Sequence, residues 1–113
     1  MSTRLSYAIK FVADMSRAVA FYRDELGLPV KFESPEWSEF ATGQTTLALH
    51  AASAQHPAGS VELGFAVADV AAFHAAKSAA GFTFTRQPKS EHGALLAAFI
   101  DCDGAECSVS SRA

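Results

Sequence analysis

The side chains best suited to acid–base chemistry in this sequence are a glutamate and a histidine on otherwise apolar strands. Glu62 lies within the run VELGF, and His50 ends the run LALH. If its strand is buried, desolvation makes the Glu62 carboxylate a stronger base, as proton abstraction requires. At a solvated strand end it would instead pair with a cation or a hydroxyl. His50 can ligate a metal, shuttle a proton or bind an anion, and it can equally be a hydrogen-bonded residue at the rim of a site.

Other polar candidates are dispersed along the chain. Arg86 and Lys89 follow a predicted strand, where they could hold a carboxylate or phosphate or simply be solvated. We expect His56, in a proline-containing linker, and His74, in a helix, at the surface. The sequence contains no glycine-rich phosphate loop, no Gly-x-Ser-x-Gly elbow and no Cys-x-x-Cys pair. Phosphate-loop, hydrolase and thiol redox chemistry therefore have no support.

The cysteine pattern also gives no support for thiol redox chemistry. Cys102 and Cys107 are the two cysteines, and they flank the predicted turn Asp103-Gly104. Two cysteines at this spacing make a poor disulfide framework, so we expect reduced thiols that serve as small packing residues.

Bulk composition places the chain among small folded proteins. Its 113 residues are the length of one domain, and 50% are hydrophobic while 19% are charged, which excludes intrinsic disorder. The net charge is -3 and the basic residues are scattered, so nucleic acid is not expected as a partner. No apolar stretch approaches the roughly 18 residues of a membrane span, and the first residues lack the apolar core of a signal peptide. We expect a cytoplasmic protein without a membrane partner.

An internal repeat predicts the architecture that must position these groups. Two segments of the chain read strand, Val-Ala-Asp, helix and glycine in the same order. Asp14 and Asp69 precede the two helices, where an aspartate can accept hydrogen bonds from free backbone N–H groups. Gly27 and Gly81 follow the helices, where a left-handed C-terminal cap is favoured. The chain is therefore expected to contain two copies of one supersecondary unit.

Apolar spacing predicts the remaining elements. Helices are expected over 16–26 and 70–80, and the short β-prone runs after them cover 29–34, 37–42, 45–51, 82–86, 94–101 and 105–110. Each copy is thus βαβββ and the fold class is α+β. The single domain divides into module one (about 1–51), a linker (about 52–60) and module two (about 61–113).

A sheet with its helix on one face leaves the other face uncovered, and two such sheets can curl into a shared cup. Strand alternation predicts that Leu47 and Leu49 point toward the helices, whereas Ala48 and His50 point into the cup. Aromatic residues that could line the cup or fill the core are Phe32, Trp37, Phe40, Phe82, Phe84 and Phe99. Trp37 is the best cavity candidate, because polar residues flank it.

These motifs resemble those of a known family. The runs VADM (12–15), AFYRDELGL (20–28) and DCDG (101–104) are similar to the V-x-D, FYxxxLG and DPxG signature of the vicinal oxygen chelate superfamily, also called the glyoxalase/bleomycin resistance protein/dioxygenase family. The resemblance covers nearly the whole chain. It implies two tandem βαβββ modules in a cup-shaped, half-open mixed β-barrel with helices outside, and it places His92 in a loop beside the cavity mouth. Members include glyoxalase I, dioxygenases, epimerases and metal-free antibiotic-sequestering proteins, so the reaction class stays open.

Enzymes of this family hold one divalent metal with four side chains, usually His, Gln or Glu. The resemblance places at those positions Tyr7, Ala48, Glu62 and Ser108. Three of these four are poor or absent ligands, whereas a catalytic metal usually needs three strong ones. A shifted metal site made by His50, Glu62 and Glu106 stays open.

Three functions are compatible with this pattern. The first is binding of a small organic molecule in the barrel cavity without a catalytic metal, as in the bleomycin-resistance branch, whose members commonly form homodimers. The second is a divalent-metal-dependent lyase, isomerase or dioxygenase of the glyoxalase I type. The third is a metal-free enzyme with Glu62 as the base and Tyr7 as a hydrogen-bond donor. The first is preferred because ligand-type residues are missing, and its predicted cavity residues are Tyr7, Trp37, Ala48, His50, Glu62, His92 and Ser108.

Overall fold

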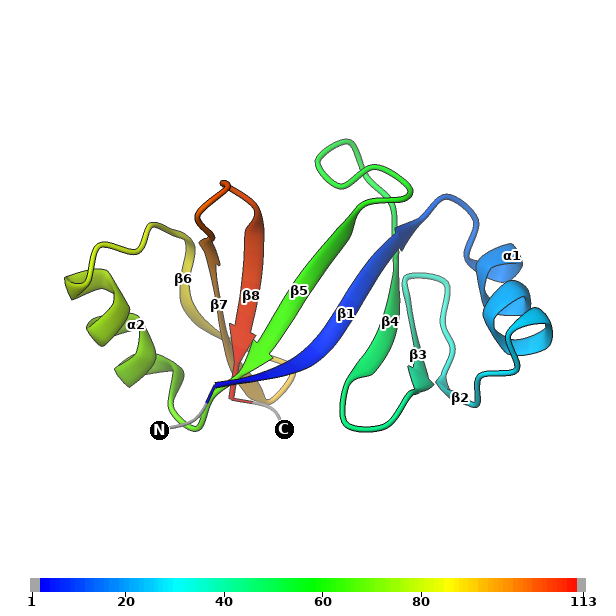
Figure 1. The fold of residues 1–113 in the computed structure, drawn as a ribbon, viewed down its shortest axis with the longest axis horizontal. Coiled ribbons are helices and arrows are strands. Elements are labelled where there is room, and N and C mark those ends of the chain that lie inside the picture. Colours follow the sequence, from blue (N-terminus) through cyan, green and yellow to red (C-terminus); the bar gives the residue numbers. More distant parts are fainter. Residues whose placement is uncertain (1–2, 112–113) are drawn as a thin grey trace. The chain divides into compact units, whose positions relative to one another are not determined.

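The computed structural model describes residues 3–111, and they divide into two compact units. The N-terminal unit spans Tyr7–Val61, and the C-terminal unit comprises residues 62–111 together with 3–6. Each unit has one helical segment beside a four-stranded sheet (Figure 1). The βαβββ prediction is confirmed for both copies.

In the N-terminal unit, β1 (Arg4–Val12) leads to α1 (Met15–Ala20), which the π-helical turn η1 (Phe21–Glu25) continues; β2 (Val30–Phe32), β3 (Trp37–Ala41) and β4 (Thr46–Ala51) follow. The strand order is β2-β3-β4-β1. Strand β1 pairs with β4 in parallel, and the other neighbours are antiparallel.

The C-terminal unit repeats this plan with β5 (Val61–Ala66), α2 (Val70–Ala79), β6 (Phe84–Glu91), β7 (Ala94–Ile100) and β8 (Glu106–Ser110). Its strand order is β5-β8-β7-β6, with β5 and β8 parallel and the other pairs antiparallel. The first strand of each copy therefore pairs in parallel with the last.

The predicted helix caps are present. The Asp14 carboxylate accepts a hydrogen bond from the backbone N–H of Arg17 at 3.1 Å, and Asp69 does the same for Ala72 at 3.0 Å. Gly81 adopts a φ of 100° just beyond α2, a conformation that favours glycine. The first helix differs from the prediction in its last turn, which widens into η1.

Strand β6 is longer than predicted. The sequence predicts a strand over 82–86 followed by a loop that contains Pro88, whereas the strand continues through Pro88 to Glu91. Proline is tolerated because β6 pairs only with β7 among the described strands, so no second ladder needs its missing N–H. Register shifts on either side of Arg86 accommodate the irregularity. His92 and Gly93 then form the tight turn into β7, both with positive φ.

Each unit has its own core between helix and sheet. In the N-terminal unit, Val19 of α1 packs with Phe40 and Leu49, and all three are essentially inaccessible to solvent. In the C-terminal unit the core forms around Val70, Phe99 and Val109, with Phe65, Phe73 and Phe84 packed against it. Leu47 and Leu49 do face the helix as predicted. Phe40, Phe84 and Phe99 are consequently core residues rather than cavity residues.

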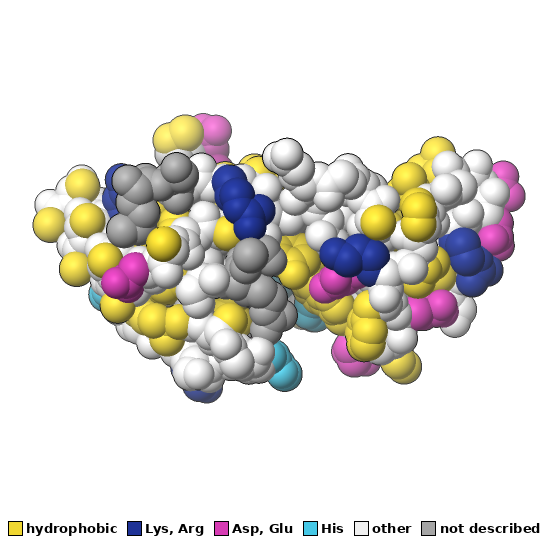
Figure 2. Space-filling view, turned by 90° about the horizontal axis from the view of Figure 1, so that it is seen from below, with side chains coloured by type: hydrophobic (Ala, Val, Ile, Leu, Met, Phe, Trp, Pro, Cys, Tyr) yellow, Lys and Arg dark blue, Asp and Glu magenta, His cyan; other side chains and the backbone are white. Residues whose placement is uncertain are grey.

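Several large apolar side chains remain exposed, among them Phe21, Leu26 and Phe32 in the N-terminal unit and Leu63 and Phe82 in the C-terminal unit. Figure 2 shows apolar side chains interspersed with charged ones on one face of the molecule. Such scattered exposure is normal, so an exposed apolar residue indicates a binding site only where a cavity or a charge lies beside it.

Candidate functional site

The helix-free face of the N-terminal sheet is covered by a small aromatic and apolar cluster. Ile9, Phe11 and Ala48 are buried there, and Tyr7 and Trp37 pack against them. These residues alternate with those that face α1, as the period of a strand requires. The cluster is the first place where predicted site residues come together, since it holds Tyr7, Trp37 and Ala48, with His50 beside them.

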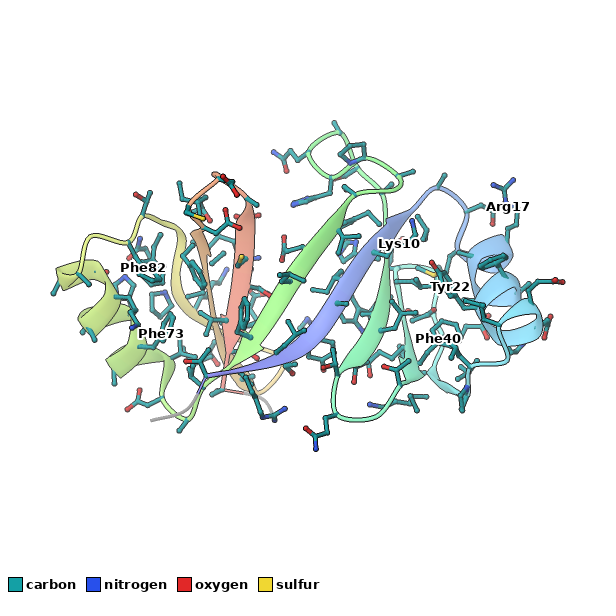
Figure 3. The ribbon with its side chains drawn as sticks, viewed as in Figure 1. Lys10, Arg17, Tyr22, Phe40, Phe73 and Phe82 are labelled. Atoms are coloured by element: carbon teal, nitrogen blue, oxygen red, sulfur yellow. The ribbon has the colours of Figure 1, made fainter. Side chains whose placement is uncertain are left out.

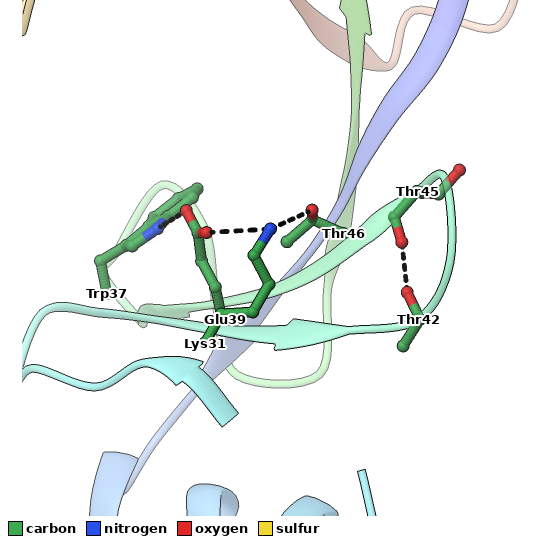
Figure 4. Close-up of polar contacts among 6 residues, drawn as sticks. All are labelled: Lys31, Trp37, Glu39, Thr42, Thr45 and Thr46. Carbon is green, nitrogen blue, oxygen red and sulfur yellow. Dashed lines mark hydrogen bonds and ion pairs between the residues drawn. The ribbon is translucent and has the colours of Figure 1, made fainter. Parts of the chain in front are cut away.

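Trp37 lies at the centre of these contacts. Its ring meets the ring of Tyr7 edge to face at a centroid distance of 5.9 Å, and that of His50 at 5.8 Å. The indole Nε1–H donates a hydrogen bond of 2.8 Å to a carboxylate oxygen of Glu39 (Figure 4). The ring is half-buried and fixed by a polar partner, so it presents a preorganised surface.

Glu39 is a residue that sequence reasoning missed. Besides accepting from Trp37, it forms an ion pair with Lys31 at 3.8 Å, and Lys31 donates to the hydroxyl of Thr46 at 3.2 Å (Figure 4). Figure 4 also shows the Thr42 hydroxyl donating to the carbonyl of Thr45 at the turn between β3 and β4. The signal in the sequence was the spacing, because residues two apart on a strand share a face.

Two histidines contact Phe11. His50 has its ring centroid 5.1 Å from that of Phe11, and its Nδ1 lies 2.8 Å from the carbonyl oxygen of Ala51. Because a carbonyl can only accept, Nδ1 carries the proton and Nε2 of the neutral ring is left as an acceptor. His56 stacks on Phe11 at 4.4 Å with 14° between the planes. His56 was predicted to lie at the surface, and it is half-buried there because its ring lies against Phe11.

On the helix-free face of the C-terminal sheet, two carboxylates approach each other. The carboxylate oxygens of Glu62 and Glu106 lie within 4.8 Å of one another. Their strands β5 and β8 are parallel neighbours with Gly64 opposite Ser108, which places Ser108 on the same side. The hydroxyl of Thr85 donates to Glu106 at 2.6 Å. Glu62 and Glu106 are both half-buried.

The two cysteines differ in environment. Cys102 is exposed, whereas Cys107 is buried on the helix side of β8. Burial raises the pKa of the Cys107 thiol, and the negative charges of Asp101, Glu62 and Glu106 raise it further. Both cysteines are free thiols, in agreement with the prediction of reduced cysteines.

The remaining predicted candidates lie elsewhere in the C-terminal unit. His92 is exposed in the turn between β6 and β7. Arg86 is engaged in an ion pair with Glu91 at 3.1 Å within the same strand. His74 was predicted to lie at the surface, and it is half-buried because its ring packs edge-on against Phe84 at 4.5 Å.

The residues at the family's metal positions do not fit a four-ligand metal site. In the N-terminal unit, Tyr7 packs its ring against Trp37, and Ala48 supplies only a buried methyl group. In the C-terminal unit Glu62 is a strong ligand, but Ser108 offers only a hydroxyl. These four residues therefore lack the three strong ligands that a catalytic metal needs.

Comparison with solved structures shows relatives that share the fold at low sequence identity. A variant of methylmalonyl-CoA epimerase from Streptomyces coelicolor, in complex with 2-nitronate-propionyl-CoA, has a TM-score of 0.80 and 19% identity over 97% of each chain. A glyoxalase/bleomycin resistance protein/dioxygenase superfamily member from Vibrio splendidus 12B01 gives 0.75 and 20%, over 96% of this chain and 98% of that one. A hypothetical protein from Bacillus halodurans C-125 gives 0.83 and 13%, over 100% and 96%.

A comparison with curated protein sequences gives no match. None of the helices in residues 3–111 is long and apolar enough to cross a membrane. The model of the Glyoxalase/Bleomycin resistance protein/Dioxygenase superfamily matches residues 4–108, nearly the whole chain. Together with the paired βαβββ units, this match shows that the chain belongs to the glyoxalase/bleomycin resistance protein/dioxygenase superfamily.

Proposed function

We propose that this protein binds a small organic molecule with a flat ring on the helix-free face of its N-terminal unit, without a catalytic metal. The observation that carries the proposal is Trp37, a half-buried ring held by Glu39 and bordered by Tyr7 and His50. A ring fixed before binding loses little conformational entropy when a ligand stacks on it.

The polar groups of this face suit an uncharged or weakly polar ligand. His50 offers Nε2 as an acceptor, so a hydroxyl or N–H group on the ligand can bond to it. The Glu39 carboxylate already accepts a hydrogen bond from the indole, and Lys31 offsets its charge. Binding then depends on the ring contact and one hydrogen bond, as in many small-molecule sites.

Trp37 fluorescence tests the proposal directly, since the chain has a single tryptophan. We expect a screen of aromatic hydroxy compounds to find ligands that change the emission saturably. Replacing His50 by Ala should weaken those ligands about tenfold through loss of the hydrogen bond. Lys89→Ala, in the other unit, serves as the control and should leave affinity unchanged. A complete absence of ligands, with near-stoichiometric bound metal by elemental analysis, would refute the proposal.

The Glu62–Glu106 pair supports a second candidate function, proton transfer at a carbon beside a carbonyl. A carboxylate can accept that proton, and the carboxylate oxygens of Glu62 and Glu106 lie within 4.8 Å of one another. The same pair could contribute two oxygen ligands to a divalent cation. Glu62→Gln should abolish turnover of a carbonyl substrate while ligand binding persists. Elemental analysis of the wild type separates the metal-free reaction from a metal-assisted one.

A further inference from the structure

An open groove of about 550 Å³ lies between β1, the α1–η1 segment and the loop before β5. Its lining includes Lys10, Phe11 and Val12 of β1, and Phe11 also belongs to the cluster against which Trp37 packs. Lys10 and Val12 alternate with Ile9 and Phe11 along β1, so their side chains face the helix side of the sheet, opposite to the ring of Trp37.

Comparison of the two repeats shows why the groove exists. Counting from the capping aspartates Asp14 and Asp69, Lys10 corresponds to Phe65 and Ala18 corresponds to Phe73. In the C-terminal unit both phenylalanines pack into the core between helix and sheet. In the N-terminal unit a lysine and an alanine replace these two rings, and the equivalent space is open.

The groove carries positive charge that has no ion-pair partner within residues 3–111. Lys10 on β1 and Arg17 on α1 both line it and form none of the ion pairs among these residues (Figure 3). The one carboxylate in the lining is Asp14, which accepts the backbone N–H of Arg17 as the helix cap. In a chain with a net charge of -3, this local excess of cations favours an anion.

Aromatic rings border the same groove. Phe21 is 51% exposed although it is a large apolar residue, and Tyr22 lies next to it with its ring 5.2 Å away in an edge-to-face contact. Tyr22 is also anchored in the core by Phe40 at 5.8 Å (Figure 3). The loop side of the groove is formed by Ala58 and Gly59, whose small size keeps it open.

We propose that this groove binds a flat organic anion, with an aromatic carboxylate as the simplest case. The carboxylate is held by Lys10 and Arg17, and the ring lies against Phe21 and Tyr22. The volume lies within the range of small-molecule sites in proteins. The groove shares Phe11 with the cluster at the proposed Trp37 site, but Trp37 is not among the residues that line the groove.

The test uses the whole chain, labelled with ¹⁵N and titrated with 2-naphthoate, while amide resonances are followed by NMR. We expect shifts at residues 13–22, 58 and 59, with binding that weakens as salt is added. The neutral analogue 2-naphthamide should bind at least about tenfold more weakly, because it cannot use the two cations. Equal affinity for both compounds would overturn the proposal.

Variants of the two cationic residues, compared with a matched control, test whether the ligand binds in the groove. Replacing Lys10 by Met and Arg17 by Gln together should lower 2-naphthoate affinity at least about tenfold. Lys77→Met is the control, since Lys77 also lies over aromatic rings, those of Phe73 and Phe82, but in the other unit (Figure 3). Its affinity should equal that of the wild type. An unchanged affinity in the double variant contradicts the proposal.

A groove-filling variant gives an independent result. Ala18→Phe introduces the ring that the C-terminal repeat has at Phe73, and it should abolish 2-naphthoate binding. Trp37→Phe should leave that binding intact, whereas it would remove the ligand of the proposed function. Shifts confined to the surroundings of Trp37 and His50 would assign 2-naphthoate to the other face and overturn the groove site.

Discussion

The two units share one plan but use their surfaces differently. The C-terminal unit closes the space between helix and sheet with phenylalanines, whereas the N-terminal unit leaves a groove there. On the helix-free faces the pattern is again unequal: the N-terminal sheet carries Trp37 with two neighbouring rings, and the C-terminal sheet carries the acidic pair Glu62 and Glu106. The two copies of one fold thus carry different side chains on the same face, aromatic rings in one and carboxylates in the other.

The largest difference between the two units is expected when a phenylalanine ring is removed from the core of the C-terminal unit. Phe73→Ala removes a ring that contacts Phe99 at 5.9 Å and Phe84 at 6.3 Å, and it should lower the free energy of unfolding by about 3 kcal/mol. Phe21→Ala in the open unit removes a ring that is 51% exposed and should cost less than about 1 kcal/mol. Urea denaturation measures both, and equal losses would contradict the comparison.

The helix caps test what the two units have in common. Asp14→Ala and Asp69→Ala each remove one hydrogen bond to a backbone N–H and should each cost about 1 kcal/mol. Asparagine at either position should restore most of the loss, because its side-chain oxygen also accepts. Thermal unfolding of the four variants checks this. A large difference between the two alanine variants would show that the caps are not equivalent.

The buried thiol predicts a pH effect specific to the C-terminal unit. The pKa of Cys107 is raised in the folded protein, so folding favours the protonated thiol. Its contribution to stability is complete below the unfolded thiol pKa of about 8.5 and is lost as pH rises through that value toward the folded one. Wild-type stability should therefore decline above about pH 8.5 more than that of Cys107→Ala, measured by urea denaturation. Iodoacetamide should modify exposed Cys102 first.

The smallest expected effect concerns the support of Trp37. Lys31→Met removes an ion pair of 3.8 Å whose lysine is half-exposed, and such pairs contribute roughly 0.2–1 kcal/mol. Glu39→Ala removes the indole's hydrogen-bond partner as well and should shift Trp37 emission to the red as the ring becomes more solvated. An unchanged emission spectrum in Glu39→Ala would mean that Glu39 does not position the ring.

The spacing of apolar and capping residues predicted the architecture, because helix caps and strand faces depend on residues that are close together in the sequence. The caps at Asp14 and Asp69 and the orientation of Leu47 and Leu49 all follow from spacing along one element. What could not be predicted depends on pairing between distant segments. The stacking of His56 on Phe11 joins a loop to a strand, and the strand through Pro88 depends on β6 lying at a sheet edge.

The candidate site, too, could be predicted only where it depends on local spacing. Strand alternation predicted that Ala48 and His50 share a face, the family resemblance placed Tyr7 at the site, and its polar neighbours indicated Trp37 as a cavity residue. Glu39 was missed because its spacing from Trp37 shows only that the two residues share a face, whereas the hydrogen bond between them is visible only in the structure. The ligand roles of the predicted residues and the expected homodimer stay predictions, which the binding experiments and sedimentation of the purified chain can test.

The tight turn of His92 and Gly93 has a consequence for the order of folding. It joins β6 to β7 directly, so this hairpin closes a very short loop and can form within microseconds. In the parallel pairs β1–β4 and β5–β8, some forty residues separate the paired positions. Closing such a long loop costs more entropy than closing the hairpin, so we expect these pairs to form later. We therefore expect each copy to form its hairpins first and to add its first strand last.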